Sequence, residues 1–117
     1  MNVLFLEYPK CSTCQKAKKW LKDHQVSYTP RHILEENPTL TELTEWLTLS
    51  KVDVKKFFNT SGLKYKELDL KSKLPLLTQE EQLALLSTDG MLVKRPLVIS
   101  DDFVLIGFKE IEWERLV

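Results

Sequence analysis

The chain has 117 residues, 43% of them apolar, which is enough for one domain with its own buried core. Seventeen basic residues balance seventeen acidic ones, so net charge gives no general reason to bind nucleic acid. No apolar stretch is long enough to span a bilayer, and the first residues lack a basic leader. We therefore expect one domain over residues 1–117, located in the cytoplasm, that binds neither nucleic acid directly nor a membrane.

The first third of the chain predicts a strand, a helix and a second strand. Asn2–Glu7 is a short apolar run that predicts a strand, at whose end we expect Glu7 to point outward. Val26–His32 predicts the second strand, with Pro30 favouring a position at the sheet edge. Between them lies a helical pattern whose apolar residues are Cys14, Ala17, Trp20 and Leu21.

The middle of the chain, about residues 38–90, predicts helices rather than strands. Apolar residues at helical spacing alternate there with breaks at Ser61–Gly62 and Asp89–Gly90. The expected helical segments are Asn37–Leu47, Lys51–Phe58, Leu63–Leu70 and Thr78–Leu86. This region reads as a helical insertion between the second and third strands.

The last third returns to strand patterns. Leu97–Ile99 and Phe103–Ile106 flank the turn residues Ser100–Asp102 and predict a hairpin, and Lys109–Leu116 predicts a short terminal helix. With a CxxC motif after the first strand, this order is typical of the α/β class and the thioredoxin-like fold. We expect a small mixed four-stranded sheet with flanking helices and the helical insertion.

Cys11 and Cys14 are the only cysteines of the chain, and they lie where the first strand gives way to the first helix. The amides at a helix N-terminus are unpaired and carry partial positive charge, so they stabilise a thiolate and lower its pKa. Cys11 is therefore a candidate nucleophile, with Cys14 as its resolving partner.

Three other interpretations of the pair remain open. A structural disulfide would close so short a loop that it would stabilise the fold only weakly. Half of a zinc site would need further ligands, but there is no third cysteine, and His24 and His32 are eight residues apart. Two buried core thiols are a third possibility. Redox chemistry is favoured because cytosolic thiols are kept reduced and a strand–CxxC–helix context is more specific than either cysteine alone.

Arg95–Pro96 is a second candidate feature. A guanidinium is always charged and forks onto oxyanions, and an X-Pro bond is the only kind that adopts cis at modest cost. The residues alone favour a surface arginine that precedes a trans proline, because few X-Pro bonds are cis.

Four ordered motifs carry a resemblance that covers essentially the whole chain. They are Tyr8–Ala17 (YPKCSTCQKA), Phe58–Gly62 (FNTSG), Lys94–Leu97 (KRPL) and Val104–Phe108 (VLIGF). Together they resemble the arsenate reductase/Spx family of thioredoxin-fold proteins, and most of all its small arsenate-reductase-related members from Gram-positive bacteria.

The resemblance implies roles for particular residues. It implies that Cys11 is the nucleophile, that Arg95 reaches the thiolate or an oxyanion, and that the Arg95–Pro96 peptide is cis and faces Cys11. Substrate contacts are implied for Ser12, Thr13, Pro96 and Asn59. A small thiol such as glutathione, or a thioredoxin- or glutaredoxin-like protein, would restore the dithiol, with no bound cofactor and no metal.

Departures from the family separate its branches. Arsenate reductases of this type gather three arginines around the oxyanion, whereas here only Arg95 matches and the other two positions hold Asn59 and Gly107. Each charge-assisted contact contributes about 1.5–3 kcal/mol, so we expect arsenate to bind weakly.

The alternative function is a redox-sensing transcriptional regulator of the Spx type, which would bind the RNA polymerase α subunit. This chain has no glycine across Thr48–Val54, where those regulators carry one at the polymerase contact, and it ends at Val117 without their longer tail. The sequence therefore favours a thiol–disulfide oxidoreductase that uses Cys11 and Cys14.

Overall fold

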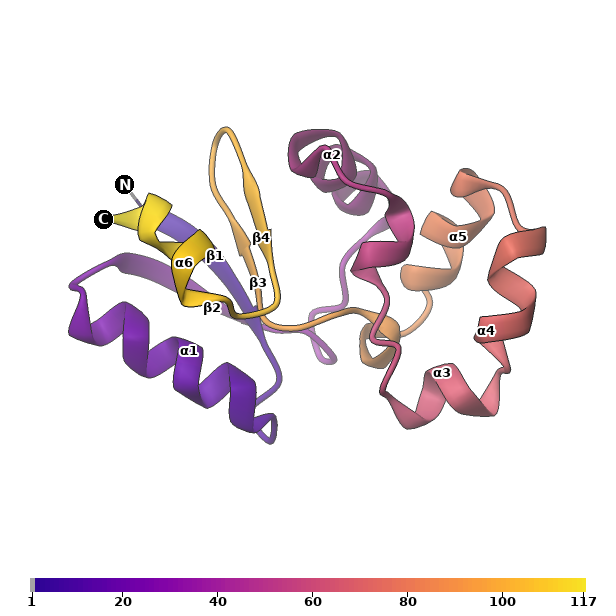
Figure 1. Cartoon of the computed structure of the whole chain (residues 1–117), viewed down its shortest axis with the longest axis horizontal. Helices are drawn as coiled ribbons and strands as arrows, with labels where there is room; N and C mark the ends of the chain where they lie inside the picture. Colours follow the sequence, from indigo (N-terminus) through magenta and orange to yellow (C-terminus); the bar gives the residue numbers. More distant parts are fainter. Residues whose placement is uncertain (1) are drawn as a thin grey trace.

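A four-stranded mixed sheet forms the centre of the protein, whose computed structural model describes residues 2–117 (Figure 1). The strands are β1 (Asn2–Glu7), β2 (Ser27–His32), β3 (Leu97–Ile99) and β4 (Val104–Ile106), in the spatial order β2-β1-β3-β4. β1 is parallel to β2 and antiparallel to β3, and β3 pairs with β4 as a hairpin. The prediction of a small mixed four-stranded sheet is therefore confirmed.

The register places proline at a sheet edge, as the sequence predicted. Pro30 lies opposite Phe5 in the pairing of β1 with β2, and β2 has no strand on its other side within residues 2–117. A proline has no N–H to donate to a ladder, so only an edge strand accommodates it without losing a hydrogen bond.

One face of the sheet is covered by the first and last helices. α1 (Ser12–Asp23) and α6 (Glu110–Trp113), which continues as a 3₁₀ turn over Glu114–Leu116, lie on this side (Figure 1). Their apolar residues pack with the sheet into one buried cluster, formed by Val3, Phe5, Ala17, Trp20, Leu21, Val98, Phe103, Leu105 and Trp113. The tryptophans at 20 and 113 are therefore core residues, as their helical spacing indicated.

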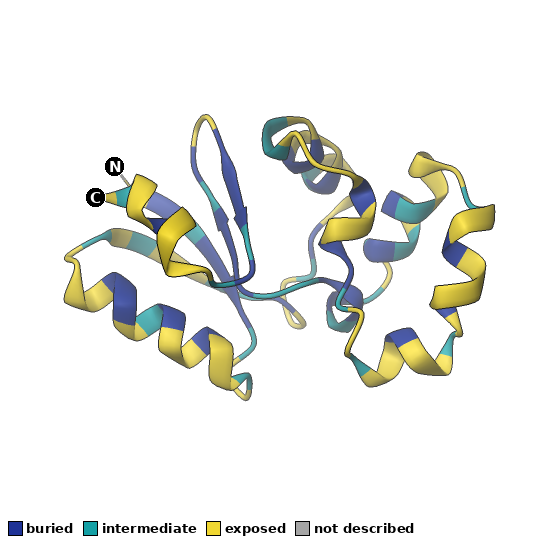
Figure 2. Ribbon diagram, viewed as in Figure 1, coloured by how far each residue is buried: buried dark blue, intermediate teal, exposed yellow. Residues whose placement is uncertain are grey.

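The helical insertion covers the opposite face. It consists of α2 (Leu40–Ser50), η1 (Val54–Phe57), α3 (Leu63–Glu67), α4 (Leu70–Lys73), η2 (Leu74–Leu76), α5 (Gln79–Leu86) and η3 (Gly90–Leu92), where η denotes a 3₁₀ helix. Its buried residues form a second cluster with Leu6, Leu97 and Val104 from the sheet. Figure 2 shows the buried residues along the inner sides of both helical layers and the exposed residues outside.

Two predicted helical segments of the insertion are shorter than expected. The prediction of a helix over Lys51–Phe58 was wrong in part, because Lys51 adopts the left-handed conformation, φ 57°, and ends α2. Only Val54–Phe57 then forms a 3₁₀ helix, capped by Asp53, whose side chain accepts from the Lys55 N–H. Leu63–Leu70 is likewise divided, by Asp69 with φ 52°.

Local sequence signals begin the two longest helices of the insertion. Thr39 and Thr78 each accept a hydrogen bond from the backbone of a glutamate three residues later, whose side chain bonds back to the threonine N–H. Close packing requires Gly90, because a side chain there would collide with the Ile33 carbonyl at the end of β2. None of the helices in residues 2–117 is long and apolar enough to cross a membrane.

Candidate functional site

A tight turn after β1 presents the two cysteines at the start of α1. The Cys11 N–H donates to the Tyr8 carbonyl (2.9 Å), and the Gln15 side chain closes the turn by donating to the Pro9 carbonyl (3.0 Å). Cys11 is the N-cap residue of α1 and is half-buried, whereas Cys14, one turn into the helix, is fully buried. The predicted strand–CxxC–helix arrangement is confirmed, and both thiols are free.

The surroundings of Cys11 favour its thiolate. Partial burial opposes ionisation, but the backbone N–H of Cys14, the Cys14 thiol, the Arg95 charge and the Thr13 N–H together lower the pKa of Cys11 below its ordinary value of 9.0. As a thiol, Cys11 makes no side-chain capping hydrogen bond. The unpaired amides of the first turn are thus available to a thiolate, as expected at a helix N-terminus.

Cys14 has the opposite character. Burial is the main influence and raises the pKa of Cys14 to about 12, with the neighbouring Cys11 acting in the same direction. The Tyr8 N–H and the Arg95 charge counteract this only in part. At neutral pH, Cys14 is therefore a protonated thiol beside a partly exposed, more acidic one, which is the asymmetry that a nucleophile and a resolving thiol require.

Three contacts hold the side chain of Arg95 in place. Its Nη1 donates to the carbonyls of Met91 (3.3 Å) and Val93 (3.4 Å), and its guanidinium lies over the Tyr8 ring, 5.3 Å from the ring centre. The Arg95–Pro96 peptide is cis, as the family resemblance implied. The positive charge of Arg95 lowers the pKa of both cysteines.

The other residues with implied substrate contacts are distributed around this centre. Ser12 and Thr13 are exposed in the first turn of α1, next to Cys11, and Pro96 is buried, with its carbonyl accepting from the Gly107 N–H (2.8 Å). Asn59 belongs to the insertion, where its N–H donates to the Leu92 carbonyl (2.8 Å). Tyr8 thus links the dithiol turn to Arg95, while Asn59 is bonded within its own layer.

The expected outward position of Glu7 was wrong. Glu7 is only 5% exposed and forms an ion pair with Lys18 of α1, with 3.1 Å between Oε2 and Nζ. Side chains alternate along a strand, so Glu7 shares the α1-facing side of β1 with Val3 and Phe5. That alternation was visible in the sequence, but the partner that makes burial of a carboxylate tolerable lies on the next element.

Tyr8 is a site residue that the sequence argument did not identify. Its backbone contacts both cysteines and its ring supports Arg95, so it connects the dithiol turn to the turn at Pro96. The sequence offered only its position within the matched motif as a signal. In residues 2–117, no three His, Cys, Asp or Glu side chains come together where they could hold a metal ion.

The sequence matches the model of the ArsC family over residues 6–116. The chain belongs to the ArsC family. It is 51% identical to the uncharacterized protein YusI of Bacillus subtilis (strain 168), over 98% of each chain. It is 33% identical to the regulatory protein MgsR of the same organism, over 98% of this chain and 90% of MgsR.

A solved structure of this ArsC family agrees with the fold. The chain superimposes on an ArsC family related protein from Bacteroides fragilis with a TM-score of 0.98 and 62% identity, over 100% of this chain and 98% of that one. The close cysteine pair fits a CxxC redox motif. The relatives of this chain include a regulatory protein, so membership of the family does not by itself separate an enzyme from a regulator.

Proposed function

We propose that this protein is a cytoplasmic thiol–disulfide oxidoreductase in which Cys11 is the nucleophile and Cys14 the resolving thiol. The observation that carries the proposal is the asymmetry of the pair: Cys11 is partly exposed with a lowered pKa, and Cys14 is buried with a pKa raised to about 12. The interpretation of two buried core thiols does not fit Cys11, because Cys11 is partly exposed.

The reaction proceeds by two exchange steps. The Cys11 thiolate attacks one sulfur of a substrate disulfide, which forms a mixed disulfide and releases the other half as a thiolate. That thiolate takes up a proton from solvent, and Cys14 loses its own proton to solvent. The Cys14 sulfur then attacks the Cys11 sulfur, which forms the Cys11–Cys14 bond and releases the second half as a thiolate that also takes up a proton. The substrate gains two electrons and two protons, and the protein is left with a Cys11–Cys14 disulfide.

Regeneration needs an external thiol. Two molecules of a small thiol such as glutathione, or one thioredoxin- or glutaredoxin-like dithiol, reduce the Cys11–Cys14 disulfide by the same exchange chemistry and are themselves oxidised. The role of Arg95 is to stabilise the Cys11 thiolate before attack, which its electrostatic influence on Cys11 supports. Ser12, Thr13, Pro96 and Asn59 are proposed to border the substrate.

Arsenate is not the proposed substrate. Only Arg95 corresponds to the three arginines that surround the oxyanion in the resembling reductases, because Asn59 and Gly107 occupy the other two positions. Absence of arsenate turnover in a coupled assay with glutathione and glutaredoxin is the expected result, and a rate above about 1 s⁻¹, within the ordinary enzyme range, would contradict it.

The disulfide reaction is tested by mass spectrometry. The reduced protein is mixed with bis(2-hydroxyethyl) disulfide and quenched with acid at intervals. We expect the wild-type chain to end as the internal disulfide, Cys14→Ser to accumulate the mixed disulfide on Cys11, and Cys11→Ser to react far more slowly. Rapid reaction of Cys11→Ser, or a lasting adduct on the wild-type chain, would contradict the assigned roles.

The second candidate function is a redox-responsive regulator that binds the RNA polymerase α subunit. The similarity to the regulatory protein MgsR favours it. A pull-down with the α subunit, under reducing and then oxidising conditions, distinguishes the two functions. Stable binding that changes with the state of Cys11 and Cys14 would support the regulator, and no binding in either state would leave the oxidoreductase as the function.

A further inference from the structure

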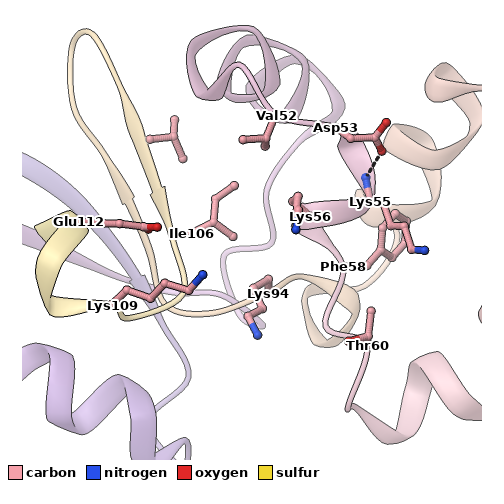
Figure 3. A pocket seen from close by; sticks show the side chains of 11 residues that line it. Val52, Asp53, Lys55, Lys56, Phe58, Thr60, Lys94, Ile106, Lys109 and Glu112 are labelled. Atoms are coloured by element: carbon pink, nitrogen blue, oxygen red, sulfur yellow. Dashed lines mark hydrogen bonds between the residues drawn. The ribbon is translucent and has the colours of Figure 1, made fainter.

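A cleft of about 620 Å³ lies between the end of the hairpin and the helical insertion (Figure 3). Val104 and Ile106 of β4 form its wall on the sheet side, and Phe58, after η1, lies on the insertion side. This volume is within the range of small-molecule sites in proteins. Neither Cys11 nor Cys14 lines the cleft, and no step of the proposed exchange reaction takes place in it.

The rim of the cleft is basic. Lys56 from η1, Lys94 before the cis-proline turn and Lys109 before α6 surround the opening, and Figure 3 shows their side chains around one shared space. In the part of the chain that the structure describes, none of these three ammonium groups has a carboxylate within ion-pair distance. The rim therefore carries positive charge that the protein itself does not neutralise.

The acidic residues of the cleft do not reverse this balance. Four lysines line it, the fourth being Lys55, against two carboxylates, Asp53 and Glu112. Asp53 is engaged in capping η1, where its carboxylate accepts a hydrogen bond from a backbone N–H at 2.9 Å. Apolar walls with surplus ammonium groups at the rim suit a small organic anion with an apolar body.

One lining residue of the cleft, Lys94, is the sequence neighbour of a residue of the dithiol site. Lys94 directly precedes Arg95, whose charge acts on Cys11. Its Cε lies 3.4 Å from the position that a Cβ on Gly107 would occupy, and Gly107 is hydrogen-bonded to Pro96. The absence of a side chain at Gly107 therefore leaves the Lys94 side chain room beside the cis-proline turn.

We propose that the cleft binds the anionic, apolar half of the disulfide that Cys11 attacks, with Lys56, Lys94 and Lys109 contacting its carboxylate. This inference rests on the proposed function and narrows its substrate to small disulfides that carry a carboxylate on an aromatic or aliphatic body. The cleft positions that half, and the sulfur chemistry remains at Cys11 and Cys14.

The kinetic test compares two chromogenic aromatic disulfides that differ in charge. 5,5′-Dithiobis(2-nitrobenzoate) carries carboxylates, and 4,4′-dithiodipyridine does not. The ratio of their second-order rate constants with the reduced protein cancels any change in the thiolate fraction of Cys11. In a Lys56→Gln/Lys94→Gln/Lys109→Gln variant we expect this ratio, carboxylate reagent over neutral reagent, to fall about tenfold or more.

A charge-matched variant controls for the loss of three positive charges. Lys64, Lys66 and Lys71 are exposed on α3 and α4 and do not line the cleft, so the corresponding triple glutamine variant should change the ratio less than twofold. An equal fall in both triple variants, or no fall in the cleft variant, would overturn the proposal. Circular dichroism and thermal unfolding establish that both variants are folded.

A binding test separates this inference from the proposed function. 5-(Methylthio)-2-nitrobenzoate is a thioether that cannot exchange, and it is titrated into a Cys11→Ser/Cys14→Ser variant followed by amide NMR. We expect shifts at Val52, Thr60 and Ile106 that disappear in the cleft lysine variant. Shifts confined to the start of α1, or none at millimolar probe, would overturn the cleft as the binding site. Failure of the wild-type chain to react with either disulfide would instead overturn the proposed function. The titration would still show whether the cleft binds the anionic probe.

Discussion

The guanidinium of Arg95 lies over the ring of Tyr8, with 5.3 Å between the guanidinium carbon and the ring centre. The Tyr8 backbone also accepts the Cys11 N–H, at 2.9 Å, and its N–H acts on Cys14. Tyr8 thus positions the Arg95 guanidinium relative to the turn that carries the two cysteines. Arg95 can therefore act on Cys11 without contacting it directly.

This relation predicts that Tyr8→Leu weakens the influence of Arg95 on Cys11. Loss of the ring removes a cation–π contact worth about 0.5–1 kcal/mol. The freed guanidinium should then stabilise the Cys11 thiolate less, so the pKa of Cys11 should rise. Tyr8→Phe keeps the ring face and should leave the pKa where it is. The alkylation rate of each variant against pH measures the effect, and a Tyr8→Leu profile that matches the wild type would contradict the positioning role.

The buried ion pair between Glu7 and Lys18 predicts a stability effect that depends on which partner is removed. The Glu7 side chain is 6% exposed and that of Lys18 is 30% exposed. Lys18→Met leaves an uncompensated buried carboxylate and should lower the free energy of unfolding by about 2–3 kcal/mol. Glu7→Gln/Lys18→Met should recover most of this loss in urea unfolding, because both charges are then absent. A double variant as unstable as Lys18→Met alone would show that the charge is not the cause.

Lys51 predicts a stabilising substitution. Its φ of 57° is in the left-handed region, which glycine adopts without steric cost. Lys51→Gly should raise the free energy of unfolding by about 0.5–1 kcal/mol, less than the full strain because glycine also loses more backbone entropy on folding. Lys66→Gly, inside α3, is the matched control. It should lower the free energy of unfolding by a similar amount, because glycine is a poor helix former.

The ion pair of Arg31 with Glu42 predicts acid sensitivity. Hydrogen bonds from Arg31, at 2.7 and 2.8 Å, and from the Thr39 N–H lower the pKa of Glu42 from 4.5 to about 2. A depressed folded-state pKa gives stability that is complete above pH 4.5 and is lost as the pH falls toward 2. Glu42→Gln should therefore flatten the decline of unfolding free energy over that interval. Glu45→Gln, exposed on the same helix, should leave the decline unchanged.

Local patterns were sufficient to predict the strands and the dithiol turn. The apolar run before Cys11, the helical spacing after it and Pro30 at the sheet edge each depend on a few neighbouring residues, which is why the sequence reveals them. The cis peptide at Pro96 was expected only from the family resemblance, because the residues alone favoured trans.

Features that depend on distant contacts were not predictable in the same way. The left-handed conformation of Lys51 ends α2 inside a run that reads as helical, and the buried position of Glu7 depends on Lys18 of the next element. The ring of Tyr8 meets Arg95 only because β1 and β3 are paired in the folded sheet. The lysines of the cleft come from three separate segments, so no local pattern could have grouped them.

The central claim is that Cys11 is the more acidic thiol of the pair and the nucleophile, and that Cys14 is the resolving thiol. The direct measurement is the iodoacetamide alkylation rate against pH for Cys14→Ser, which reports Cys11, and for Cys11→Ser, which reports Cys14. We predict a midpoint below 9.0 for Cys11 and one above 9.0 for Cys14, whose burial is unchanged in the Cys11→Ser variant. A lower midpoint for Cys14 than for Cys11, or equal midpoints for the two, would contradict the account.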